Sequence, residues 1–268
     1  MSKFSFAASS FCGLGEKGIN KGVVEKSMST LDQKEPRYGI VIPVCNDAEC
    51  LDEVLEELRE ALPEGRFTMA VGLNGTSDGS GDIAISCGAI VGETERRGYG
   101  YGCVAAIDAL QERGEEVVAY IFCAGDGASR PEDVLALVQR FEATQAPFVI
   151  GLRRFTLLTW WQEFGRAMPN LILGVAGIFL TGRFHHDLGP LRLIEKSFFR
   201  NLALKEMTWG WTIEAEVRAS RLGVIAETVP VEERPRLQGE QKVSGVSLVQ
   251  SLRIGTHILM AGIRARFD

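Results

Sequence analysis

The sequence predicts an α/β fold in which helices flank a mostly parallel sheet. Short apolar runs rich in β-branched and aromatic residues, such as Tyr38–Val44 and Val117–Phe122, are typical of strands buried on both faces. Between them, apolar residues recur at helical spacing, as in the stripe from Leu51 to Leu62. Strands that alternate with helices in this way are typical of parallel sheets. Hydrophobic residues make up 46% of the 268 positions, enough to fill a sizeable core.

The expected elements alternate regularly in the first half of the chain and less regularly in the second. We expect strands at Tyr38–Val44, Phe67–Leu73, Gly88–Glu93, Val117–Phe122, Phe148–Gly151 and Val224–Val231. Helices follow the first, third and fourth of these strands, and two later helices end at about Leu222 and Ala265. We interpret residues 1–36 as a poorly ordered N-terminal extension and residues 37–268 as a single domain, of which 37–153 form a nucleotide-binding half.

Composition excludes several classes of protein. The formal net charge of −6 argues against general nucleic-acid binding. The six cysteines form no CxxC pair, which favours free thiols in a reducing compartment. The most apolar segment, Leu171–Leu180, is about half the ~20 residues that a spanning helix needs. We interpret this segment, with Trp160 and Trp161 before it, either as a packed helix or as a peripheral contact with a membrane surface.

Asp126 is the leading candidate for a metal–phosphate site. It lies between Gly125 and Gly127, directly after the central buried strand. Open α/β sheets bind ligands at the carboxyl ends of their strands, and Mg²⁺ and Mn²⁺ prefer carboxylate oxygens. An ordinary Gly-Asp-Gly turn remains the alternative.

Three further groups of residues are candidates. Gly98 and Gly100 begin a helix whose amides could cradle phosphate, beside the cations Arg96 and Arg97. A basic loop after the last strand could close over a diphosphate, or could be solvated; its cations are Arg234, Arg236 and Lys242. Glu214 opens a helix and is interpreted either as a general base or as an acid favoured there by the helix dipole.

Short motifs in order along about 38–262 resemble the family-2 inverting glycosyltransferases with a GT-A fold. The resemblance is closer to the catalytic domain of the polyprenyl-phosphate (dolichyl-phosphate) mannosyl- and glucosyltransferases. The motifs are Ile42–Asp47, Asn74–Gly79, Arg97–Gly100, Asp126-Gly127 with Pro131–Asp133, Val149–Gly151, Asp187–Arg192, Gly210–Glu214, Val229–Val231 and Lys242–Gly245.

The resemblance implies a Rossmann-like sheet, a UDP- or GDP-sugar donor, Mg²⁺ or Mn²⁺, and inversion at the anomeric carbon. It implies that 154–268 form the acceptor half, that Asp126 approaches the metal, and that Glu214 or Asp187 acts as base if the acceptor is a hydroxyl. The residues expected to bind the nucleotide and its phosphates are Pro43, Cys45, Asp47, Asn74, Asp78, Arg97, Gly98, Gly100, Arg234, Arg236 and Lys242.

The sequence departs from the family pattern at four positions. Ala124 replaces the first aspartate of the aspartate–any–aspartate signature, Cys45 a tyrosine, Leu73 an aspartate, and Gln241 a serine. We expect transfer to a polyprenyl-phosphate-like acceptor by an enzyme that is cytoplasmic, either free or peripheral at the inner face of the membrane. The alternatives are transfer to a small-molecule hydroxyl, non-catalytic sugar-nucleotide binding, and a nucleotidyltransferase.

Overall fold

The computed structural model describes residues 36–153, 177, 180–181, 189–232, 234–237 and 248–268. Residues Pro36–Asp268 form one compact unit. The expected N-terminal extension therefore lies outside the described residues except for Pro36. Asp187, Lys242 and most of the expected apolar stretch at Trp160–Leu180 also lie outside them.

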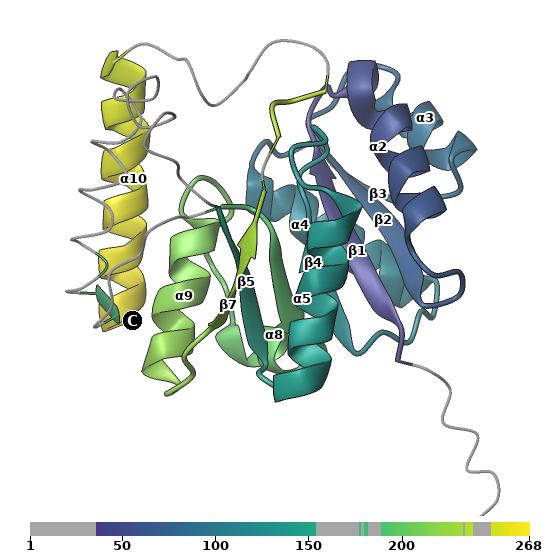
Figure 1. The fold of residues 1–268 in the computed structure, drawn as a ribbon. Helices are drawn as coiled ribbons and strands as arrows, with labels where there is room; N and C mark the ends of the chain where they lie inside the picture. Colours follow the sequence, from purple (N-terminus) through teal and green to yellow (C-terminus); the bar gives the residue numbers. More distant parts are fainter. Residues whose placement is uncertain (1–35, 154–176, 178–179, 182–188, 233, 238–247) are drawn as a thin grey trace, which may run out of the picture. The chain divides into compact units, whose positions relative to one another are not determined.

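A seven-stranded sheet forms the centre of this unit, with the strand order β3-β2-β1-β4-β6-β5-β7 (Figure 1). All neighbouring strands are parallel except at β6, which runs antiparallel to both β4 and β5. The strands are β1 (Tyr38–Val44), β2 (Phe67–Asn74), β3 (Ile90–Thr94), β4 (Ala119–Phe122), β5 (Phe148–Arg153), β6 (Arg192–Glu195) and β7 (Glu227–Val231). The expected mostly parallel α/β architecture is confirmed.

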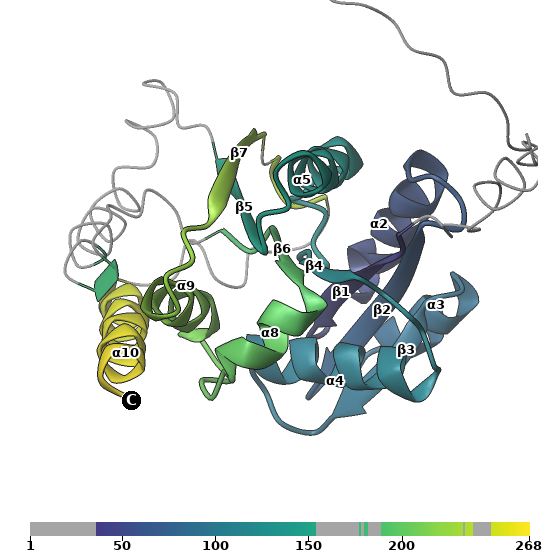
Figure 2. The same cartoon turned by 90° about the horizontal axis from the view of Figure 1, so that it is seen from below.

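Helices cover both faces of the sheet. Seen from below, α2 and α5 lie on one side, and α4, α8 and α9 on the other (Figure 2). The helices are α2 (Ala48–Ala61), α3 (Ser80–Ser86), α4 (Tyr99–Glu112), α5 (Pro131–Thr144), α8 (Lys196–Leu202), α9 (Trp211–Arg221) and α10 (Leu248–Phe267). α10 packs on α9 through a small separate cluster that includes Ile213, Val217, Ala261 and Ala265.

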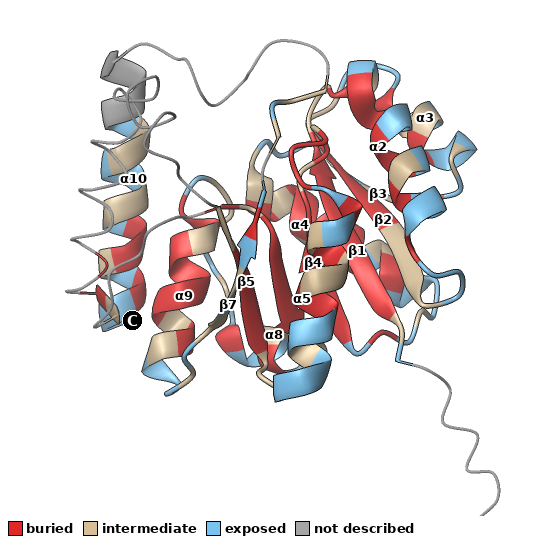
Figure 3. Cartoon of the chain, viewed as in Figure 1, coloured by how far each residue is buried: buried red, intermediate tan, exposed pale blue. Residues whose placement is uncertain are grey.

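Strand β4 shows why the sheet is buried on both faces. Successive side chains of a strand point to opposite faces. Ala119 and Ile121 accordingly join the core under α2 and α5, whereas Tyr120 and Phe122 join the core under α4, α8 and α9. All four side chains are buried, and the buried residues run through the central strands while the outer helix faces are exposed (Figure 3).

Three elements were not expected from the sequence. α3 follows β2 where we expected only a turn cluster, and β6 and α8 follow one another in the second half. The expected strand at Gly88–Glu93 begins two residues later, at Ile90, because Gly88 has a positive φ of 78° and belongs to the preceding turn. The expected strand at Val224–Val231 begins at Glu227.

Candidate active site

Three polar residues stand at the edge of the sheet where parallel strands end. β1 pairs in parallel with both β2 and β4. Asp47 follows β1, Asn74 ends β2, and Asp126 follows β4. The carboxyl ends of parallel strands share one edge, so the register of the sheet brings these residues to the same side.

Asp47 forms an ion pair with Arg236, from the loop after β7. Nη2 of Arg236 donates to Oδ1 of Asp47 at 2.6 Å, and the two side chains are 8% and 12% exposed. The other oxygen, Oδ2, accepts the backbone amide of Cys45 at 3.2 Å. Burial lowers the pKa of Arg236, but the bond to Asp47 and the charges of Asp47 and Asp126 raise it overall. Arg236 therefore stays cationic in the field of two carboxylates.

Asp126 is held by its own turn and by the same loop. Its Oδ1 accepts the backbone amide of Ala128 at 3.1 Å, which is an Asx turn. Its carbonyl accepts the amide of Leu237 at 3.1 Å. Leu237 lies so close to Gly127 that a Cβ there would meet Leu237 Cδ1 at 2.5 Å, and Gly127 has a φ of 75°. The loop after β7 is thus fixed on the turn that carries Asp126.

Arg234 fixes that loop to helix α2. Its Nε donates to the carbonyl of Gly127 at 2.6 Å, and its two terminal nitrogens bind the two oxygens of Glu57. We had expected Arg234 to close over phosphate. The structure instead directs its guanidinium at Glu57, and a bidentate pair of this kind uses the same donors that a phosphate would need.

Asn74 and Asp78 organise the backbone around the strand ends. The Asn74 amide donates to the carbonyl of Val44 at 2.8 Å and accepts the amide of Gly98 at 3.1 Å. Asp78 accepts the amide of Ala48 at 3.0 Å and that of Ser80 at 3.1 Å, which satisfies free donors at the starts of α2 and α3. Both side chains therefore shape the site through structural bonds.

Pro43, Cys45 and Arg97 differ in their access to solvent. Pro43 is buried and lies against Gly102, whereas Cys45 is half-buried. Arg97 is exposed beside Gly75 and forms no hydrogen bond or ion pair within the described residues. Among the candidate cations that the structure describes, Arg97 therefore carries the charge most accessible to a ligand.

The glycine run at the start of α4 packs on the segment before α9. The amides of Gly100 and Tyr101 both point to the carbonyl of Met207, at 3.0 and 3.4 Å. A Cβ on Gly100 would meet Trp211 Cε3 at 2.5 Å and the Met207 Cα at 2.8 Å. The glycines allow this segment to pack closely on Met207 and Trp211. The expected contact of Gly98 and Gly100 with phosphate stays a prediction.

Glu214 is a buried structural carboxylate. It is 3% exposed, and its oxygens accept the backbone amides of Lys205 and Glu206, the latter at 2.7 Å. Nε of Arg218 donates to it at 2.8 Å. These bonds tie the loop before α9 to the helix and occupy both oxygens. These contacts agree with the alternative of an ordinary acid at a helix start, and the role of Glu214 as a general base stays a prediction.

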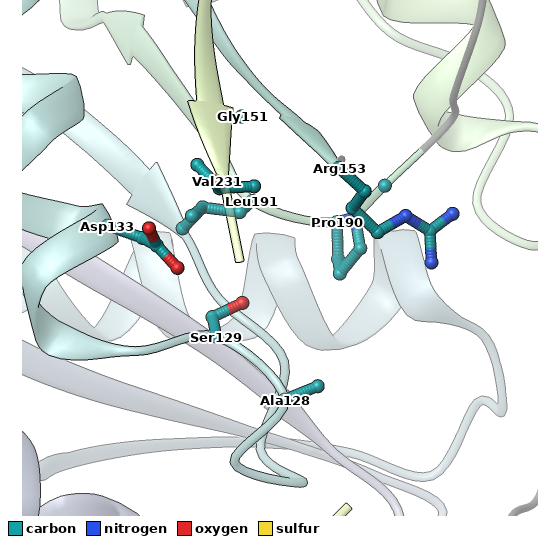
Figure 4. A pocket seen from close by; sticks show the side chains of 9 residues that line it. Ala128, Ser129, Asp133, Gly151, Arg153, Pro190, Leu191 and Val231 are labelled. Carbon is teal, nitrogen blue, oxygen red and sulfur yellow. The ribbon is translucent and has the colours of Figure 1, made fainter. Parts of the chain in front are cut away.

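A pocket lies beside the Asp126 turn, at the ends of β5 and β7. Figure 4 shows Asp133 and Arg153 on opposite sides of Leu191 and Val231, with Ser129 below them. Oδ2 of Asp133 is buried and lacks a hydrogen bond within the described residues. Burial raises the pKa of Asp133, although backbone amides of Glu232 and Arg130 oppose the rise. The pocket is lined by the carboxyl group of Asp133 and the hydroxyl group of Ser129, and the guanidinium of Arg153 is directed away from both (Figure 4).

A preformed metal site is absent from the described part of the chain. No three His, Cys, Asp or Glu side chains gather there as ligands. Asp126 supplies one carboxylate, and Ala124, two residues earlier, supplies none. Magnesium is usually bound through one or two carboxylates together with substrate phosphates. Asp126 therefore fits a cation that binds together with a phosphate ligand.

Sequence reasoning missed the partners that hold these residues. Glu57 lies on α2 with no pattern to distinguish it from its acidic neighbours Glu53 and Glu56. Met207 acts through its backbone carbonyl, which no side-chain motif reveals. Arg192 appeared only as the end of a motif, yet it is buried and forms an ion pair with Glu216 at 2.8 Å.

Comparison with known proteins identifies relatives over most of the chain. The family model described as Glycosyl transferase family 2 matches residues 39–202. The undecaprenyl-phosphate mannosyltransferase of Micrococcus luteus is 27% identical over 252 residues, covering 86% of this chain and 98% of that protein.

Solved structures show the same fold at low identity. Glucosyl-3-phosphoglycerate synthase from Mycobacterium tuberculosis, in complex with Mn²⁺, uridine diphosphate and glucosyl-3-phosphoglycerate, gives a TM-score of 0.64 at 15% identity. The match covers 86% of this chain and 80% of that one. The same synthase with Mn²⁺, UDP-glucose and phosphoglyceric acid gives 0.64 at 15% identity, over 87% and 80% of the two chains. The expected GT-A fold is confirmed.

Proposed function

The chain belongs to glycosyl transferase family 2 and is a glycosyltransferase, and from that premise we propose that it transfers a sugar, with inversion, from a nucleoside-diphosphate sugar to a polyprenyl-phosphate-like acceptor. The observation that carries the proposal is the meeting of Asp47, Asp126 and Arg236 at the carboxyl edge of the sheet. The extended match to an undecaprenyl-phosphate mannosyltransferase supports the acceptor class.

The donor would lie across the ends of β1, β2 and β4. Asp47 and the accessible Arg97 border the place for the nucleoside, and Arg236 supplies the positive charge for the diphosphate. Arg236 must then exchange part of its bond to Asp47 for bonds to phosphate. Charge-assisted hydrogen bonds from a fixed guanidinium would stabilise the negative charge that grows on the leaving diphosphate.

A divalent cation fits this site through Asp126. Magnesium or manganese bound with the donor diphosphate would supply additional positive charge for the leaving group. The Asx turn leaves Oδ1 bonded to Ala128 and fixes the direction of the carboxylate. With Ala124 in the place of a second acid, we propose that the donor phosphates complete the binding of the cation.

The acceptor would approach the Asp126 turn from the side of β5 and β7. A lipid phosphate is already an anionic nucleophile, so it needs no strong general base, which agrees with the structural use of Glu214. If the acceptor is a hydroxyl, Asp133, in the pocket beside that turn, could accept its proton, and Asp187, outside the described residues, stays a second candidate.

Location follows from this acceptor. No described helix combines the length and apolar character needed to cross a bilayer. From the proposed lipid acceptor, we propose a cytoplasmic enzyme that meets this acceptor peripherally, at the inner face of the membrane.

Product analysis with separate acceptor classes tests the proposal. The protein is incubated with UDP- and GDP-sugars and Mn²⁺, with either undecaprenyl phosphate in detergent or a panel of small hydroxyl and phosphorylated acceptors. We expect sugar transfer to the lipid phosphate with inverted anomeric configuration. Transfer confined to small acceptors would replace the lipid with a metabolite, and donor binding without turnover on any acceptor would contradict the catalytic proposal.

A further inference from the structure

One face of α10 presents cations and large apolar side chains to solvent. Its exposed residues follow a spacing of four and three, which places them in one stripe along the helix. Met260 is 54% exposed and Phe267 is 84% exposed. We call this face the α10 stripe; it consists of Arg253, His257, Met260, Arg264 and Phe267.

The opposite side of α10 holds the helix in place. Ala261 and Ala265 are buried against Ile213 and Val217 of α9. The helix therefore buries one side in the fold, and packing on α9 does not account for the exposed Met260 and Phe267. Large apolar side chains that are clustered with cations in solvent mark an interaction surface more often than isolated ones do.

Trp209 adjoins the α10 stripe. It is 44% exposed and belongs to the loop before α9. Together with Thr208 it lines a shallow groove whose other wall is formed by Arg253, Ile254 and His257 of α10. An exposed tryptophan beside arginines is typical of surfaces that meet the boundary between lipid headgroups and acyl chains.

The charge of this surface is positive although the chain is acidic overall, with a formal net charge of −6. Glu206 lies beneath the stripe, where His257 and Arg264 approach it at 3.4 and 3.5 Å, and its side chain is 14% exposed. Asp268, at the end of the helix, pairs with Lys205 at 3.2 Å. Lys205 balances Asp268, whereas Glu206 balances the stripe's own Arg264. Arg253 forms no ion pair within the described residues, so its charge keeps this part of the stripe positive.

We propose that the α10 stripe and Trp209 dock the enzyme on an anionic phospholipid surface. The inference rests on the proposed lipid-phosphate acceptor, which resides in a membrane. The cations would meet the headgroup phosphates, and Trp209, Met260 and Phe267 would enter the headgroup–acyl boundary. The remaining surface of this acidic protein is repelled by anionic lipid. The cationic stripe therefore determines which face of the protein approaches the membrane.

Vesicle sedimentation of the full chain, without donor or acceptor, tests docking directly. We expect binding to vesicles of equal parts phosphatidylcholine and phosphatidylglycerol, weak binding to phosphatidylcholine alone, and weakening by salt. Arg253→Gln should lower partitioning about fivefold, the effect of one arginine near an anionic surface. The double variant Met260→Ser, Phe267→Ser should lower it more than tenfold because two apolar side chains no longer enter the lipid.

Matched controls lie on the same helix and elsewhere on the surface. Arg266→Gln removes an exposed cation of α10 that is two residues from Arg264 and so does not share its face. Ile225→Ser removes a side chain that is 59% exposed, on the loop before β7. Both controls should keep vesicle binding. Binding that is absent, or that falls equally in the controls and the stripe variants, overturns the inference.

Two further outcomes separate this inference from others. If the stripe variants abolish a dimer seen by light scattering and leave vesicle binding unchanged, a second copy of the chain occupies the face and the lipid proposal is wrong. Transfer to undecaprenyl phosphate in detergent is measured in parallel. Stripe variants that retain transfer but lose vesicle binding support docking, whereas wild-type vesicle binding without any transfer contradicts only the proposed function.

Discussion

Nη2 of Arg236 lies 2.6 Å from Oδ1 of Asp47, and the two residues are 189 positions apart in the chain. The bond joins the loop after β7 to the residue that precedes α2, directly beside Asp126. A cation so placed can balance two carboxylates when the site is empty and a diphosphate when the donor is bound. The predictions below follow from this arrangement and from the packing that supports it.

Arg236→Ala should weaken nucleoside diphosphate binding by ~1.5–3 kcal/mol, the value of a hydrogen bond to a charged group. Titration calorimetry with UDP and GDP measures the change. Arg59→Ala, on the exposed side of α2, is the control and should bind as the wild type does. Unchanged affinity in Arg236→Ala would remove this residue from the donor site.

Arg234 and Glu57 should be coupled in stability. Their side chains are 21% and 35% exposed, so solvent screens part of the attraction. We expect a coupling of about 0.5–1 kcal/mol in a double-mutant cycle of Arg234→Ala and Glu57→Ala, measured by urea unfolding. A coupling energy of zero, together with a large loss of donor affinity in Arg234→Ala, would instead support the prediction that Arg234 binds phosphate.

Gly100→Ala should destabilise the protein by about 1–3 kcal/mol, because the new methyl group overlaps Trp211 and the backbone of Met207. Gly255→Ala is the matched control, since a Cβ at that helical position meets no atom within 4 Å. It should be neutral or stabilise the helix by up to about 1 kcal/mol. Thermal unfolding compares the two, and equal stability would show that the 207–211 segment does not pack on α4 as described.

Cys123 should make stability fall at high pH. Burial raises the pKa of this thiol to about 12, whereas an unfolded cysteine titrates near ~8.5. Between these values the native state keeps a proton that the unfolded state loses, so the free energy of unfolding decreases as pH rises. Above pH ~9, the free energy of unfolding of the wild type should fall by roughly 1 kcal/mol per pH unit more than that of Cys123→Ala. Identical slopes in the two proteins would show that the native thiol ionises normally.

The sequence predicted the fold where a local pattern determined it. Runs such as Tyr38–Val44 could be assigned because a strand buried on both faces is apolar at every position. β6 escaped notice because it has four residues and begins with Arg192, whose charge breaks the apolar run. That arginine is tolerated in the core because its Nε and Nη1 donate to the carbonyls of Gly189 and Thr212, and the carboxylate of Glu216 balances its charge. Such distant partners cannot be read from a local window.

The sequence predicted where the candidate site lies, but not which partner each of its side chains contacts. The position after a buried strand placed Asp126 at the carboxyl edge of the sheet, whereas Asp47 was assigned to the nucleotide pocket only by the family resemblance. Whether a charged residue faces a ligand or a structural partner depends on long-range contacts, as with Arg234 on Glu57. Glu214 is a second example. The sequence pattern of an acid at a helix start is the same whether the side chain binds the backbone of a loop or accepts a proton from a substrate.

The most direct test is the rate of nucleoside diphosphate release from the donor, in the presence of undecaprenyl phosphate and Mn²⁺, for the wild type and Asp126→Ala. The account predicts a loss of about 100-fold or more on removal of this carboxylate, with folding intact. Asp82→Ala, an exposed acid on α3, should retain the wild-type rate. A wild-type rate in Asp126→Ala would contradict the account.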